Sequence, residues 1–236
     1  MTEGHRYFLA RLAQVSDDEL SAPSALPGWT GRHILSHVGH NARALGRLAH
    51  WAATGEPTPM YPGPTARAAE IALGARWDPD RLRSFVEVEQ DALAAAFGKL
   101  DAGHWATEVV TAQGRHVTAA ALPWLRTREV WVHTADLHRA ADFPDFPPPL
   151  LDELIVDVLR FRRDARDEAL QVRPTDRDIT PPFDGQAPPV WIEGRTADLA
   201  RWLTGRGAAN IRASGQSALP ALGPWLDTTR PHITRS

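Results

Sequence analysis

The first 140 residues contain long stretches in which apolar residues recur at helical spacing, separated by short clusters of proline and glycine. The longest stretches cover residues 30–53, 78–100 and 119–140, whereas TGEPTPMYPGPT at 54–65 holds too many prolines and glycines for regular structure. Amphipathic helices joined by short connections bury their apolar stripes against one another. We therefore predict a mostly α chain whose first part is a four-helix bundle.

A proline-rich segment, ADFPDFPPP at 141–149, separates this helical part from the remainder. Beyond it, residues 150–170 and TADLARWLTG at 196–205 have the pattern of helices. Short strands are predicted at QVRP, DRDIT, PVWIEG and NIRASG. We therefore expect two domains, a helical bundle over residues 1–145 and a small α/β domain over residues 150–236.

Composition excludes several classes of function. The 26 basic and 29 acidic residues give a formal net charge of −3, so nucleic acid is not expected as the main partner. The chain has no cysteine, which excludes disulfides, cysteine-bound zinc and a cysteine nucleophile, and any thiol chemistry needs an external thiol. The nearly apolar run from Ala119 to Leu125 is far shorter than the ~18 residues that cross a bilayer. With no signal-peptide pattern at the N-terminus, we expect a soluble, cytoplasmic protein with no membrane partner.

Charged side chains fall in the middle of an apolar helix face within residues 119–140. At about 100° per residue, Glu129 and His133 lie inside this face and Asp136 lies beside them. The face itself is formed by Leu122, Leu125, Val130, Val132, Leu137 and Ala140. A carboxylate and an imidazole are costly to bury unless something compensates them. Their spacing of four residues places both on one side of the helix, one turn apart.

His37 is the histidine of the 30–53 helix that is best placed to face a bundle interior. It lies with Asn41 along one margin of the apolar face, whereas His33 and His40 are further round and His50 points the opposite way.

Together, His37, Glu129 and His133 would supply three nitrogen and oxygen ligands. A catalytic zinc uses that number and keeps a fourth position open for water or substrate. The same set would also accept Fe(II), Co(II) or Ni(II). Asp136 is placed to orient a ligand imidazole.

Other interpretations of these residues stay open. An E-x-x-x-H pair is more often a pair of neighbours on a solvated helix face, and HILSHVGH fits a solvated face equally well. A single histidine beside an apolar face is usually a hydrogen-bonded core residue. The contact between the two helices is itself an inference.

The same residues lie in motifs that resemble a known family. LPGWTGRHILSHVGHNA, AHWAATGEPTPMY and TAQGR…WLRTREVWVHTADL are similar to the mycothiol-dependent maleylpyruvate isomerases of the DinB-like superfamily. The similarity covers nearly all of residues 25–140 and continues at TADLARWLTGRG, but 171–190 has no clear match. The resemblance implies a DinB-like four-helix bundle and a metal, usually zinc, held by a His, a Glu and a His. The matching positions are His37, Glu129 and His133.

The resemblance also implies two arginines that bind the substrate and take part in catalysis, matching Arg67 in PTARAAEIA and Arg206 in TGRG. Similar enzymes convert maleylpyruvate to fumarylpyruvate in gentisate breakdown. A double bond does not rotate thermally, but a thiolate can add to it, permit rotation and leave again. Metal binding deprotonates a thiol at neutral pH, and planar guanidinium groups suit the two substrate carboxylates.

The first functional hypothesis is therefore a metal- and thiol-dependent maleylpyruvate isomerase. Mycothiol is the implied thiol, with ergothioneine or another small thiol as alternatives. A thiol S-transferase on the same scaffold, a non-catalytic metal-binding stress protein and a metal-dependent hydrolase stay open as other hypotheses. For the oligomeric state, we expect a monomer or a weak homodimer.

Overall fold

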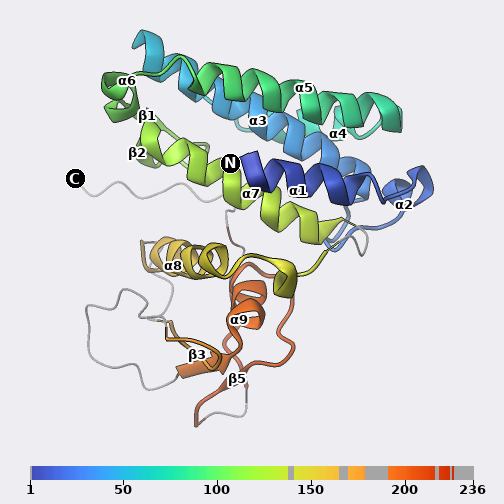
Figure 1. The fold of residues 1–236 in the computed structure, drawn as a ribbon, viewed down its shortest axis with the longest axis vertical. Helices are drawn as coiled ribbons and strands as arrows, with labels where there is room; N and C mark the ends of the chain where they lie inside the picture. The colour runs from blue at the N-terminus through green and yellow to red at the C-terminus, as the bar shows by residue number, and fades with distance from the viewer. Residues whose placement is uncertain are drawn as a thin grey trace. The chain divides into compact units, whose positions relative to one another are not determined.

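The computed structural model describes residues 2–137, 141–164, 170–178, 191–215, 218–223 and 225 (Figure 1). In chain order the elements are α1 (Thr2–Leu12), α2 (Asp17–Ser21), α3 (Gly31–Thr54), α4 (Ala66–Gly74), α5 (Pro79–Phe97), α6 (Ala102–Ala106), β1 (Glu108–Val110), β2 (His116–Thr118), η1 (Ala119–Ala121), α7 (Leu122–Asp136), η2 (Phe143–Asp145), α8 (Pro148–Asp164), β3 (Gln171–Pro174), β4 (Trp191–Gly194), α9 (Thr196–Leu203) and β5 (Arg212–Ala213). Within the described residues, no helix has the length and apolar content that a bilayer crossing requires. The described chain divides into two compact units, one up to Ala141 and one from Asp142 onward.

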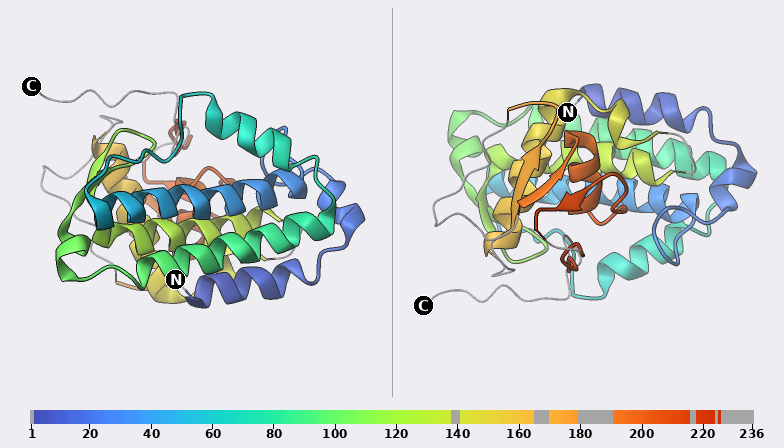
Figure 2. Two further views of the ribbon diagram at one scale, coloured as in Figure 1. Left: turned by 90° about the horizontal axis from the view of Figure 1, so that it is seen from above. Right: turned by 90° about the horizontal axis from the view of Figure 1, so that it is seen from below.

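Helices α1, α3, α5 and α7 of the first unit lie side by side, which confirms the predicted four-helix bundle (Figure 2). Helix α3 packs against α5 and α7, and α1 packs against α7. Gly39 permits the close approach of α3 to α5, because a Cβ atom at this position would overlap the ring of Phe85. Leucines of three helices, among them Leu45, Leu93 and Leu122, fill the core between them.

Local sequence signals explain where most of these helices begin and end. Ser16 and Glu19 form a capping box at the start of α2. Helix α3 ends at Gly55, whose φ of 75° is the left-handed conformation that glycine adopts without strain.

The helix predicted over residues 119–140 is shorter than expected. Residues Ala119–Ala121 form a 3₁₀ turn, and the α-helix begins at Leu122 with Pro123 in its first turn, where a missing N–H costs nothing. It ends at Asp136, because the N–H of Leu137 bonds the carbonyl of Thr134 and the backbone there is already extended. Residues 138–140 of the prediction lie outside the described residues.

A short hairpin and an additional helix connect α5 to α7. Strands β1 and β2 pair antiparallel, with Glu108 opposite Thr118, and Gly114 in their turn has a φ of 75°. Helix α6 was not predicted, because five residues are too few to show an apolar period. Its signal is Asp101, whose side chain caps the helix by accepting a hydrogen bond from the N–H of His104 at 2.9 Å.

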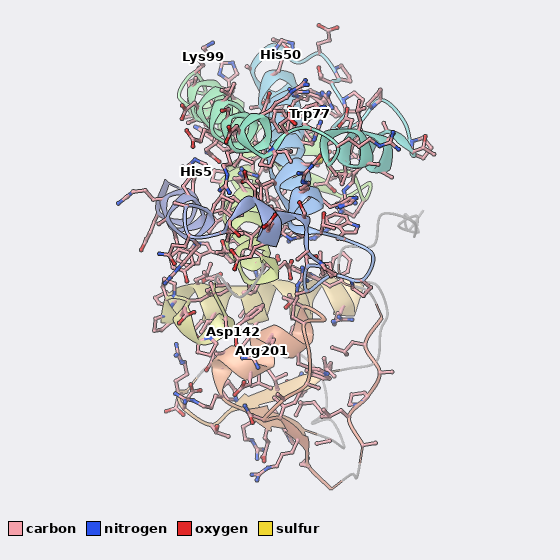
Figure 3. The ribbon with its side chains drawn as sticks, turned by 90° about the vertical axis from the view of Figure 1, so that its right-hand side faces the viewer. His5, His50, Trp77, Lys99, Asp142 and Arg201 are labelled. Atoms are coloured by element: carbon pink, nitrogen blue, oxygen red, sulfur yellow. The ribbon has the colours of Figure 1, made fainter. Side chains whose placement is uncertain are left out.

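The second unit is the predicted small α/β fold. Strand β3 pairs parallel with β4, β4 pairs antiparallel with β5, and α8 packs against α9. An ion pair of 2.9 Å between Asp142 and Arg201, labelled in Figure 3, links the start of this unit to α9.

The strand predicted at DRDIT is wrong for residues 176–178, which form no strand. The Asp176 carboxylate instead accepts hydrogen bonds from the backbone N–H and the hydroxyl of Thr196, at 2.9 and 2.7 Å. Ile179 and Thr180, the rest of that predicted strand, lie outside the described residues.

His5 on α1 makes the stability of the first unit depend on pH. Burial and the nearby Arg126 lower the pKa of His5 to about 4, against a smaller opposing effect of Asp91. Because the folded pKa lies below the unfolded value, the contribution of His5 to stability is complete above pH 6.5 and is lost as the pH falls toward 4. We therefore expect His5→Phe to lose less stability than the parent between about pH 7 and about pH 4.5, measured by urea denaturation. Equal losses in the two chains would contradict this expectation.

Candidate metal centre

His37 lies two turns into α3 and faces the interior of the bundle. Its side chain is only 3% exposed, and its Nε2 atom lies 3.1 Å from Oε2 of Glu129. The indole of Trp29, just before α3, meets the imidazole edge-on with ring centres 5.6 Å apart. The Nδ1 atom of His37 is buried and has no hydrogen-bond partner among the described residues.

Glu129 and His133 come from α7, one turn apart on the same side of the helix. Oε2 of Glu129 lies 3.4 Å from Nε2 of His133, and the rings of His37 and His133 are 4.6 Å apart and nearly perpendicular. Each of the three side chains offers one donor atom within 4.8 Å of the others. The structure thus brings together His37, Glu129 and His133, the cluster called the triad below.

Asp136 fixes the orientation of His133. Its side chain is fully buried, and its Oδ2 atom lies 2.7 Å from Nδ1 of His133. A hydrogen bond from Nδ1–H to this carboxylate leaves Nε2 of His133 directed to the other members of the triad. A carboxylate behind an imidazole is the arrangement that supports histidine ligands in metal sites.

The environment prepares the triad electrostatically for a cation. Burial, followed by the charge of His133, lowers the pKa of His37 to about 3, so this ring is neutral at neutral pH. Burial alone would raise the pKa of Glu129, but hydrogen bonds from His133 and His37 hold it well below its usual range. Burial would lower the pKa of His133, but hydrogen bonds to Asp136 and Glu129 raise it, so a metal would displace the proton that these carboxylates favour on this ring. Neutral imidazole and ionised carboxylate are the forms that bind metals.

The distances within the triad fit a divalent metal. Tetrahedral sites with bonds of about 2.0–2.1 Å to nitrogen and oxygen place neighbouring donor atoms about 3.3 Å apart. The Glu129 oxygen is 3.1 and 3.4 Å from the two histidine Nε2 atoms. Two imidazoles and one carboxylate are also a donor set that zinc accepts while one position stays open.

Arg67 lies in the first turn of α4, next to the loop that precedes this helix. Its positive charge is close enough to His37 to lower the pKa of that ring further. Burial raises the pKa of Tyr61 in the same loop to about 12, an effect that Arg67 opposes by its charge and by a hydrogen bond. Glu129 also acts on Tyr61, so Tyr61 and Arg67 both lie within electrostatic range of the triad.

Arg47 of α3 holds this loop in place. Its Nη1 donates to the carbonyl of Met60 at 2.5 Å, and its Nη2 lies 3.6 Å from Oε1 of Glu70. The sulfur of Met60 accepts a hydrogen bond from the N–H of Ala112 at 3.1 Å. These contacts fix the segment that leads into Arg67.

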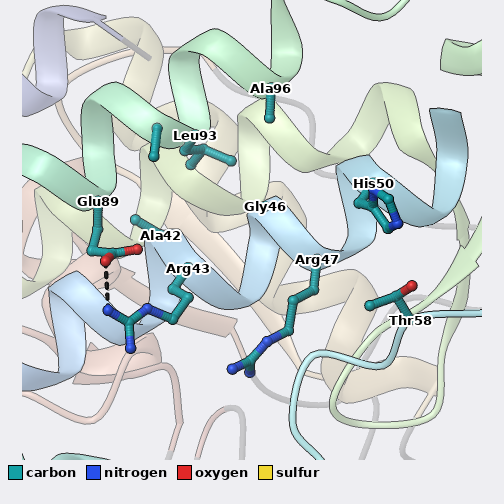
Figure 4. Close-up of a pocket in the computed structure, with 10 residues that line it drawn as sticks. Ala42, Arg43, Gly46, Arg47, His50, Thr58, Glu89, Leu93 and Ala96 are labelled. Carbon is teal, nitrogen blue, oxygen red and sulfur yellow. Dashed lines mark hydrogen bonds and ion pairs between the residues drawn. The ribbon is translucent and has the colours of Figure 1, made fainter.

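A separate groove of about 320 Å³ runs between α3 and α5 (Figure 4). Arg43 and Glu89 pair across it at 2.6 Å, and Gly46 and Leu93 are among its lining residues. No member of the triad lines this groove.

Arg206 belongs to the second unit, directly after α9. Its backbone N–H donates to the carbonyl of Arg201 at 2.9 Å, and its Nη1 donates to the carbonyl of Thr204 at 2.6 Å. Gly205 and Gly207 have φ values of 82° and 116°, so the TGRG motif forms a turn that requires glycine at these two positions. A role of Arg206 toward a substrate rests on the sequence resemblance.

One residue of α3 and one residue just before it differ from the sequence-based expectation. His40 was expected away from the apolar face, but it is only 4% exposed because Trp77 and Phe85 cover that side of α3. Its Nδ1 atom lies 2.8 Å from the carbonyl oxygen of Ser36. Trp29, which packs on His37, was missed, although it stands in the motif LPGWTGRH.

Asp136→Asn tests the support behind His133. We expect the variant to bind divalent metal about 10–100-fold more weakly, because the amide lacks the charge that strengthens the imidazole as a ligand. Competition with a chromophoric chelator measures this affinity, and Asp18→Asn on the exposed face of α2 is the matched control. Equal affinity in the parent and in Asp136→Asn would exclude a supporting role.

Comparisons with known proteins identify the family of this chain. Residues 1–138 match the family model described as the mycothiol maleylpyruvate isomerase N-terminal domain. The crystal structure of the mycothiol-dependent maleylpyruvate isomerase is similar to this chain with a TM-score of 0.87 and 35% sequence identity, covering 95% of this chain and 93% of that chain. The crystal structure of a histidine-to-alanine variant of that enzyme gives a TM-score of 0.86 with the same identity and coverage. A search of curated proteins finds no match.

The family model covers more than half of the chain, and the structural similarity extends over both units. The chain therefore belongs to the family of mycothiol-dependent maleylpyruvate isomerases.

Proposed function

We propose that this chain is an isomerase that converts maleylpyruvate to fumarylpyruvate, a step of gentisate degradation, with zinc and a small thiol. The observation that carries the proposal is the convergence of His37, Glu129 and His133 in a member of this family. The chain contains no cysteine, so the thiol has to be a separate molecule. Mycothiol is the thiol named for the similar crystal structures.

In this proposal the triad holds the metal through Nε2 of His37, Nε2 of His133 and Oε2 of Glu129. Asp136 keeps the His133 ring in the required tautomer. When bound, the metal and its thiol supply a thiolate at neutral pH that adds reversibly to the substrate double bond.

Arg67 is proposed to bind a substrate carboxylate with paired hydrogen bonds and to stabilise the negative charge that develops during addition. Its position within electrostatic range of His37 and Tyr61 supports this role. With its pKa near 12, Tyr61 keeps its proton throughout the neutral range. Arg206 is proposed as a second carboxylate-binding residue on the basis of the TGRG match.

The test is an assay of the zinc-loaded protein with maleylpyruvate, followed by absorbance and by product analysis. We expect fumarylpyruvate to form with mycothiol and not without a thiol, and parallel assays with ergothioneine identify the preferred thiol. A product that carries the thiol covalently would establish an S-transferase instead. Absence of turnover with every thiol would contradict the proposed isomerase.

A further inference from the structure

Arg126 of α7 is a fully buried cation whose hydrogen-bond partners, within the described part of the chain, are all uncharged. Its Nε donates to Oε1 of Gln90 at 2.9 Å, and its Nη1 donates to the carbonyl of Val38 at 2.7 Å and to Oδ1 of Asn41 at 2.9 Å. Its Nη2 atom has no hydrogen-bond partner among the described residues. All three partners are neutral groups of α3 and α5.

Burial of an uncompensated charge is expensive, whereas a neutral side chain could make comparable hydrogen bonds at lower cost. Hydrogen bonding between helices therefore does not account for a guanidinium at this position. Burial lowers the pKa of Arg126 to about 10, so it keeps its positive charge at neutral pH. The positive charge of Arg126 must therefore have a role other than hydrogen bonding between the helices.

The acidic group that acts on Arg126 through space is Glu129, three residues later on the same side of α7. Arg128 is also buried but is adjacent to Glu129 in sequence, so it leaves α7 on a different side. Arg67 is only partly buried, and His5, which Arg126 also affects, is neutral at neutral pH. Arg126 is thus the fully buried positive charge of α7 that lies one turn from the triad.

The formal charges of Glu129, Asp136 and Arg126 balance in one particular state, and the partly exposed Arg67 adds a positive charge that solvent screens. Glu129 and Asp136 contribute two negative charges and Arg126 one positive charge, which leaves one negative charge. A divalent metal changes the total to one positive charge, and a metal-bound thiolate brings it to zero. Without Arg126, the same thiolate state would have one positive charge fewer, which is unfavourable for an anion in a buried site.

We propose that Arg126 is a positioning residue that makes the fourth metal position prefer an anionic sulfur ligand, through its charge rather than through contact. This inference rests on the metal and thiolate of the proposed function. It predicts opposite effects on two ligands: loss of the charge weakens thiolate binding and leaves metal binding equal or stronger. Loss of packing would weaken both.

The experiment uses the Co(II)-loaded protein and 2-mercaptoethanol, a thiol that carries no charge besides its thiolate. Sulfur-to-cobalt absorbance measures thiolate binding across a pH series, and chelator competition measures Co(II) affinity. Two variants cancel the charge: Gln90→Glu places a carboxylate at the Nε of Arg126, and Arg126→Met removes the cation. Two control variants keep the positive charge: Arg126→Lys retains a cation at this position, and Gln90→Met removes only one hydrogen bond to Arg126.

We expect Gln90→Glu and Arg126→Met to bind the thiolate about tenfold more weakly at neutral pH and to raise the pH midpoint of binding by about one unit. Both should bind Co(II) at least as tightly as the parent, and both controls should behave like the parent. If Arg126→Met does not fold, the Gln90→Glu variant alone tests the proposal. It adds a negative charge beside Arg126 while the shape of side chain 90 stays nearly the same.

Parent-like thiolate affinity and pH midpoint in Gln90→Glu would overturn the proposal. Parallel loss of metal and thiolate in Gln90→Met or Arg126→Lys would also overturn it, since it would show a packing role. Failure of the parent Co(II) protein to bind any thiol is a different result, which contradicts the proposed function itself.

Discussion

His133→Ala is expected to bind divalent metal at least about a hundredfold more weakly than the parent and to lose isomerase activity. The substitution removes one of three donor atoms, a larger change than loss of a supporting partner, which alone costs about 10–100-fold. It also leaves the fully buried Asp136 carboxylate without the imidazole that lies 2.7 Å away. Metal titration and the maleylpyruvate assay measure the two effects.

His50→Ala is the matched control, because His50 is an exposed histidine near the end of α3. We expect this variant to keep the metal affinity and activity of the parent. Stoichiometric, tightly bound metal in His133→Ala would show that the triad is not the metal site, whatever the activity of the variant.

Arg67→Met is expected to lower kcat/KM for maleylpyruvate by about 10²–10³-fold, the range seen when one group that stabilises developing negative charge is removed. Lysine at this position should restore only part of the rate, because it cannot form the two parallel hydrogen bonds that a guanidinium makes to a carboxylate. Metal affinity should change little, since Arg67 offers no donor atom to the triad. Steady-state kinetics on metal-loaded protein provide the measurement.

Arg76→Met serves as the control, because Arg76 is an exposed arginine just beyond the end of α4. A kcat/KM for Arg67→Met equal to that of this control would remove Arg67 from the substrate-binding role. A loss of metal in Arg67→Met would instead indicate a structural effect on α3 and His37.

The apolar period of the sequence was sufficient to predict the bundle, because long amphipathic helices have few other ways to bury their stripes. It was also sufficient to place Glu129 and His133 on the inner face of α7. It could not establish that His37 reaches them, since that contact depends on how α3 and α7 pack, over 92 residues of separation. Only the three-dimensional structure shows the 3.1 Å approach of His37 to Glu129.

The sequence-based prediction did not include the burial of His40 or the role of Arg126, and the reasons differ. His40 is buried by Trp77 and Phe85, which come from a different part of the chain and do not appear in a helical wheel of α3. Arg126 was detectable: at about 100° per residue it falls about 40° from the centre of the same apolar face that holds His133. A cation on this apolar face is as unusual as the Glu129 carboxylate on the same face.

The members of the triad come from helices far apart in the chain, and this has a consequence for folding. An unfolded chain does not hold these donors together, so an ion seated among them binds the native state alone and shifts the unfolding equilibrium toward it. At a free concentration one hundred times its dissociation constant, such an ion adds about 2.7 kcal/mol to stability. Thermal melting in the presence and absence of a chelator therefore reports occupancy of the centre without any substrate, and metal-starved cells would contain a population more easily degraded.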